Sequence, residues 1–129
     1  MFEEFVKDDL ISTYDYVDYG IYHLDGEGEI KHLPCLLSIE KIHLIQWVPS
    51  AKVGCPSYAD PLNWIDLFRW IQDAGKSVLV YCPPERVAPL LSKIDRDRVY
   101  LSVSCPDEDT ALGVLRDLDR AGRRRGVSL

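Results

Sequence analysis

The fold class is decided by residues 60–82, which place a helix and a strand in direct succession: DPLNWIDLFRWIQDAGKSVLVYC. Asp60 can cap a helix at the position before Pro61, apolar residues then recur at helical spacing, and Gly75 can end the helix. The next run, residues 77–82, is short, apolar and β-branched, which favours a buried strand. This segment therefore predicts one repeat of an alternating α/β fold.

The same alternation extends in both directions from this segment. We expect a single α/β domain over residues 1–129, with an N-terminal helix in 1–19 and four βα units in 20–129. Strands that alternate with helices form parallel sheets, because each parallel return needs a crossover. The expected strands are 20–26, 42–48, 77–82 and 99–105, and the expected helices are 2–19, 30–39, 61–74, 85–94 and 107–121.

Four βα units correspond to half of a TIM-type (β/α)8 barrel, whose full length is about 250 residues. In that arrangement all helices cover one face of the sheet. The alternative is an open doubly wound parallel sheet, with helices on both faces. Composition and periodicity fit both architectures.

Composition limits the partners and the cellular compartment. The net charge of −6 disfavours nucleic acid, since phosphate binding needs clustered cations. No apolar stretch approaches the roughly 20 residues that span a bilayer, so no membrane segment is expected. The first residues show neither the basic nor the apolar region of a signal peptide, so none is expected, and the 4 cysteines lie in separate segments. These features indicate a cytoplasmic protein whose cysteines are thiols or metal ligands.

Residues that can carry chemistry follow the C-terminal ends of the strands, where parallel α/β folds bind ligands. His23 and Asp25 stand two apart, so both side chains point to one face of their strand. They are candidates for an acid–base pair, and together with Cys105 for a zinc site, with Cys82 as a substitute ligand. The polar or aromatic residues at the ends of the second and third strands are candidate substrate-binding residues: Gln46, Trp47 and Tyr81.

Three motifs carry a resemblance to a known family: YHLDGEG at 22–28, QWVP at 46–49 and the helix from Trp64 that ends in IQDAGK at 71–76. From about Tyr19 to Ala121 the chain resembles the C-terminal half of the uroporphyrinogen decarboxylase-like superfamily. The resemblance implies a (β/α)8 barrel with its pocket at the strand C-terminal ends. The superfamily includes the decarboxylase and zinc-dependent methyltransferases, which move a methyl group between a corrinoid protein and a thiol such as coenzyme M.

The methyltransferase branch implies roles for three residues. Its zinc ligands resemble His-x-Cys-Gly at one strand end, with a further cysteine from a late strand. His23 matches the histidine, Asp25 stands in the place of the first cysteine, and Cys105 is the candidate for the late one. The aspartate is a departure from this pattern, since carboxylate replaces thiolate. Carboxylate is the harder ligand of the two.

The resemblance thus leads to three expected functions. The first is methyl transfer to a thiol, with zinc as cofactor and a corrinoid either as substrate or on a partner protein. The second is a non-catalytic half-barrel that binds a ligand or a partner. The third is decarboxylation of the uroporphyrinogen decarboxylase type.

A half-barrel leaves one sheet face and two edge strands uncovered, whereas parallel sheets are rarely exposed on a face. We therefore expect a homodimer. With a two-fold axis along the barrel centre, the first strand of each copy pairs with the fourth strand of the other, and the barrel closes at eight strands.

Overall fold

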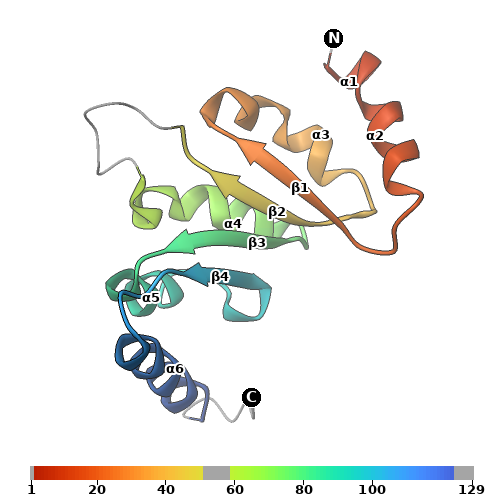
Figure 1. The fold of residues 1–129 in the computed structure, drawn as a ribbon. Helices are drawn as coiled ribbons and strands as arrows, with labels where there is room; N and C mark the ends of the chain where they lie inside the picture. The colour runs from red at the N-terminus through yellow and green to blue at the C-terminus, as the bar shows by residue number, and fades with distance from the viewer. Residues whose placement is uncertain (1, 51–58, 124–129) are drawn as a thin grey trace.

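The computed structural model describes residues 2–50 and 59–123 (Figure 1). Two short helices precede four strands that alternate with helices, some of which begin as short 3-10 helices (labelled η). The elements are α1 (Phe2–Phe5), α2 (Lys7–Tyr14), β1 (Gly20–Asp25), η1 (Glu27–His32), α3 (Leu33–Leu37), β2 (Ile42–Val48), η3 (Pro61–Trp64), α4 (Ile65–Asp73), β3 (Ser77–Cys82), α5 (Pro84–Leu91), η4 (Arg96–Arg98), β4 (Val99–Val103) and α6 (Glu108–Arg123).

The four strands form one parallel sheet in the order β1-β2-β3-β4, so each strand pairs with the next one in sequence. Figure 1 shows α3, α4 and α5 together behind this sheet, while its front face is bare of helices. The expected parallel α/β fold is confirmed. Because the strand order never reverses, the described residues form a singly wound sheet, which excludes the doubly wound alternative and is compatible with half of a (β/α)8 barrel.

Several element boundaries differ from the sequence expectation. The helix expected over 2–19 is two helices, and α2 ends at Tyr14. The helix expected over 30–39 is η1 followed by α3, with Pro34 in the first turn of α3. Proline suits a first turn because it has no backbone N–H to donate. The strands over 42–48 and 77–82 have the expected bounds.

The hydrophobic core lies between the sheet and its helices. Strand residues alternate in exposure, because successive side chains point to opposite faces. The strand side chains on the helix-covered face, all buried, include Leu24, Ile45, Trp47, Val78 and Val80. On the opposite side, which we call the open face, Ile21, Tyr81 and Tyr100 are 55%, 53% and 61% exposed. The core therefore occupies one side of the sheet only.

Gly20 begins β1 where no side chain fits. A Cβ atom there would collide with the ring of Tyr14 and with the carbonyl oxygen of Lys41. We expect Gly20→Ala to lower the free energy of unfolding by about 1–3 kcal/mol, the usual cost of overpacking, as measured by urea denaturation. Gly28→Ala is the control, because a Cβ at Gly28 meets open space. Equal stability of the two variants would contradict this account of β1.

Candidate functional site

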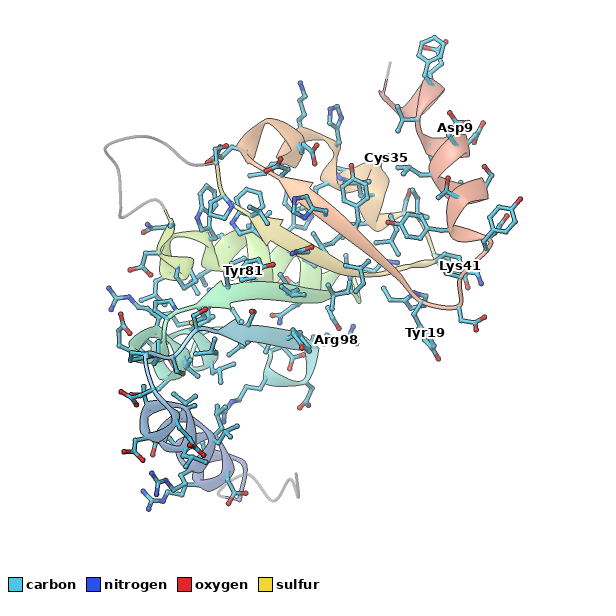
Figure 2. The ribbon with its side chains drawn as sticks, viewed as in Figure 1. Asp9, Tyr19, Cys35, Lys41, Tyr81 and Arg98 are labelled. Atoms are coloured by element: carbon cyan, nitrogen blue, oxygen red, sulfur yellow. The ribbon has the colours of Figure 1, made fainter. Side chains whose placement is uncertain are left out.

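A chain of hydrogen bonds crosses three strands on the open face of the sheet. His23 on β1 is in register with Gln46 on β2, and His23 Nδ1 lies 3.1 Å from Gln46 Oε1. Gln46 Nε2 donates to the hydroxyl of Tyr81 on β3 at 2.8 Å. Figure 2 shows Tyr81 over β3. The structure thus brings together one candidate catalytic residue and two candidate substrate-binding residues.

The hydrogen-bonded row of His23, Gln46 and Tyr81 can orient the His23 imidazole in either neutral tautomer. In one orientation of the Gln46 amide, His23 Nδ1–H donates to Gln46 and His23 Nε2 keeps a lone pair. With the amide flipped, Tyr81 donates to Gln46, Gln46 donates to His23 Nδ1, and Nε2 carries the proton. His23 Nε2 is therefore available as a base in the first state and as an acid in the second.

Asp25 lies two residues beyond His23, on the same face of β1, and is exposed. Its backbone N–H donates to Glu29 Oε2 at 3.1 Å. The Asp25 carboxylate therefore lies beside the hydrogen-bonded row of His23, Gln46 and Tyr81. Among the described residues, no hydrogen bond joins this carboxylate to that row. Asp25 can supply negative charge to a ligand over this face.

The expected zinc site does not form within one chain. His23 and Asp25 lie on β1, whereas Cys105 follows β4, at the opposite edge of the sheet. Three strand spacings of about 4.8 Å separate the two edges by roughly 14 Å, far more than a shared ion allows. In residues 2–50 and 59–123 no group of three His, Cys, Asp or Glu side chains could hold a metal ion. The described residues of a single chain therefore provide no zinc site.

Cys82 is unsuited to replace Cys105 as a ligand. It faces the helices, is 3% exposed, and donates a weak hydrogen bond to the carbonyl of Pro83 at 3.4 Å. Burial, together with smaller contributions from the nearby Asp60 and Glu85 carboxylates, raises the pKa of the Cys82 thiol to about 11, although Arg86 acts in the opposite direction. Zinc binds the thiolate form, which this environment disfavours.

The described cysteines form no disulfide, as expected for separate thiols: Cys35, Cys82 and Cys105. Cys35 and Cys82 are buried, and Cys105 is half-buried. Cys55 lies outside the described residues.

Trp47 lies on the helix-covered face, opposite to Gln46 and Tyr81, since successive residues of a strand point to opposite faces. It is 2% exposed and packs against Trp64, with ring centroids 4.8 Å apart. Trp47 therefore cannot contact, from the open face, a substrate that Gln46 binds there.

Two further residues lie on the open face that the sequence analysis did not select. Tyr100 is in register with Leu79, and Ser102 with Tyr81. The sequence could have indicated them, because side chains two residues apart on a strand share a face, which groups positions 100 and 102. They extend the polar and aromatic surface to β4.

Neither a scan against family models nor searches of curated proteins and of solved structures yields a match to this chain. Within the described ranges, every helix is too short or too polar to cross a bilayer.

Proposed function

We propose that the C-terminal end of the open face borders a corrinoid-binding pocket at the mouth of a barrel of the uroporphyrinogen decarboxylase-like type. The observation that carries this proposal is the His23–Gln46–Tyr81 chain, which lies on a sheet face that no described helix covers. Tyr81 adds exposed aromatic surface near the C-terminal end of β3, which suits a large flat ring. Corrinoids are the ligand class implied by the sequence resemblance.

A second copy of the chain completes this pocket. Parallel sheets are almost always covered on both faces, and the open face exposes large apolar side chains such as Ile21 and Tyr81. A two-fold axis along the barrel centre places β1 of each copy beside β4 of the other. All eight strands then run parallel, and two His23 chains face one pocket.

The free edge of β1 carries two hydrogen bonds that this closure must replace. The Tyr14 hydroxyl donates to the carbonyl of Ile21 at 2.8 Å, and the backbone N–H of Asp25 donates to Glu29 at 3.1 Å. The ladder to β2 uses the other side of the strand, where Gly20 and Gly26 donate to β2 and its flanking residue. Tyr14 and Glu29 therefore compete with an incoming strand.

Removing the Tyr14 hydroxyl is expected to tighten the dimer. Tyr14→Phe keeps the ring that packs on Gly20 but frees the Ile21 carbonyl. A dimer contains two such bonds, each worth about 0.5–1.5 kcal/mol, so the dissociation constant should fall about 5- to 150-fold in sedimentation equilibrium. Tyr16→Phe, at an exposed tyrosine on the segment after α2, is the control. An unchanged constant in Tyr14→Phe would mean that association does not use the β1 edge.

Methyl transfer to a thiol is the activity that this pocket supports best. Barrel closure puts β1 of one copy next to β4 of the other, and this brings Cys105 of a second copy toward His23 and Asp25. That pairing would bring to one place the nitrogen, oxygen and sulfur ligands that a single chain holds at opposite edges of its sheet. Bound zinc would activate the acceptor thiol, and the His23 chain would orient the imidazole that holds it.

The test uses methylcobalamin as the probe, with 2-mercaptoethanesulfonate as the acceptor and elemental analysis for zinc. We expect binding that weakens at least tenfold in His23→Ala and in Tyr81→Phe but not in Tyr16→Phe. Loss of the methyl–cobalt absorbance, together with stoichiometric zinc, would establish the methyltransferase. Binding without methyl loss would establish the non-catalytic alternative. Absence of binding, or binding insensitive to these variants, would overturn the corrinoid pocket.

A further inference from the structure

The backbone of β1 presents every second residue to the free edge of the sheet. β1 and β4 are the two edge strands (Figure 1). On the inner side of β1, Gly20 donates to the carbonyl of Lys41 and Gly26 to that of Val48, so the even-numbered residues bond toward β2. The odd-numbered residues therefore turn their N–H and C=O groups outward, as the carbonyl of Ile21 does.

The backbone of β4 presents a matching set at the other edge. Followed through the registers of the four strands, the same alternation turns residues 100 and 102 toward β3 and residues 99, 101 and 103 outward. β4 ends the sheet order, so no described strand lies beyond it. Both edges can therefore join one parallel ladder.

Closure into a barrel fixes the offset between the two edges. A (β/α)8 barrel has a shear of roughly eight residues over its eight strands, which is about one residue per strand. Because the strands tilt with a right-handed coil, a position at the same height lies one residue further along on each next strand. The Gln46–Tyr81 hydrogen bond follows this slope, since Tyr81 lies beyond Leu79, the ladder partner of Gln46.

This slope identifies the partners across the seam between two chains. At the height of His23 on β1 lie position 47 on β2 and Tyr81 on β3. Val103 follows at that height on β4. A two-fold axis along the barrel returns to His23 of the second copy at the same height. The ladder partner of Val103 on that strand is therefore one residue earlier, at Tyr22 of the second copy.

The directions of side chains and backbone groups agree with this register. It sets Ile21 opposite Ser102, and both lie on the open face. A shift by one residue would pair an inward side chain with an outward one. The register also aims the N–H of Val103 at the carbonyl of Ile21, the acceptor that the Tyr14 hydroxyl occupies in the single chain.

We propose that β1 pairs with β4 of a second copy in the register that sets Ile21 opposite Ser102 and Tyr22 opposite Val103. The Val103 N–H then replaces the Tyr14 hydroxyl at the Ile21 carbonyl. Extended by one residue, the seam places the exposed Ser104 of the second copy opposite His23, which adds a hydroxyl to the mouth of the pocket. This inference rests on the barrel closure under the proposed function and specifies which positions meet.

Disulfide formation between introduced cysteines in the full chain tests the register. Positions in register on neighbouring strands have Cα atoms about 5 Å apart, within reach of a disulfide, whereas an offset of two residues raises this to about 8 Å. We expect Ile21→Cys with Ser102→Cys to give a covalent dimer at least about tenfold faster than Ile21→Cys with Tyr100→Cys. His23→Cys with Ser102→Cys, offset in the other direction, should be as slow as the latter.

Non-reducing electrophoresis measures the covalent dimer over time, and the wild type under the same oxidation reports any link through its own cysteines. Faster linkage of an offset pair would overturn this register. Equal or absent linkage in all three variants, with a wild type that sediments as a dimer, would overturn the pairing of β1 with β4. A wild type that sediments as a monomer would overturn barrel closure itself, and the register with it.

Discussion

Replacing Gln72 with leucine is expected to lower the free energy of unfolding by about 2–4 kcal/mol. Gln72 on α4 is 7% exposed and makes three hydrogen bonds to the segment that leads into β4. Its Nε2 donates to the carbonyls of Asp95 at 2.8 Å and of Arg98 at 3.1 Å. Its Oε1 accepts from the backbone N–H of Asp95 at 2.9 Å. Leucine has similar size but leaves all three backbone groups without this partner.

Urea denaturation of Gln72→Leu measures this loss. The control is Asp73→Ala at the next position, which is exposed and should change stability by less than about 0.5 kcal/mol. If Gln72→Leu were as stable as the control, Gln72 would not be what anchors β4 to the helix layer.

Alkylation of Cys82 by iodoacetamide at pH 8 is expected to be at least about a hundredfold slower than that of an accessible thiol of ordinary pKa. The reason is that burial raises the pKa of Cys82 to about 11, so that very little thiolate is present. Peptide mapping over time measures each site separately, and Cys105, the least buried of the described cysteines, should be modified first. Labelling of Cys82 as fast as Cys105 would contradict its placement in the core.

The same thiol makes stability depend on pH above neutrality. The pKa of Cys82 is raised in the folded state, so the unfolded chain loses this proton first as pH rises. The stabilising contribution is complete below the ordinary thiol pKa, near pH 9, and is lost as pH rises toward about 11. The unfolding free energy of the wild type should therefore fall more steeply over this range than that of Cys82→Ala. Parallel pH profiles would contradict the shift.

Much of the fold follows from local sequence signals. Pro61 and Gly75 mark the ends of one helical segment, and β2 and β3 are bounded by turn residues, so these elements have the expected positions. The two-residue period of a strand also explains why His23, Gln46 and Tyr81 share a face.

Two candidate residues that were chosen because they lie near strand ends have side chains on the helix-covered face. Trp47 and Cys82 lie at or near the C-terminal ends of their strands and can form hydrogen bonds, but their side chains point into the helix layer. That direction follows from the phase of the strand, not from its C-terminal position. Whether Cys105 approaches His23 depends on closure of the sheet, which strand patterns leave open.

In the dimer that we propose, the open face becomes the inside of a barrel when two chains associate. Sedimentation velocity of the full chain at micromolar concentration tests it most directly. We expect a species of twice the 14.7 kDa chain mass, which a charge on the open face, as in Leu79→Glu, should dissociate. Leu115→Glu, at an exposed leucine on α6, should leave it intact. A stable wild-type monomer of 14.7 kDa would contradict closure of the barrel by two chains.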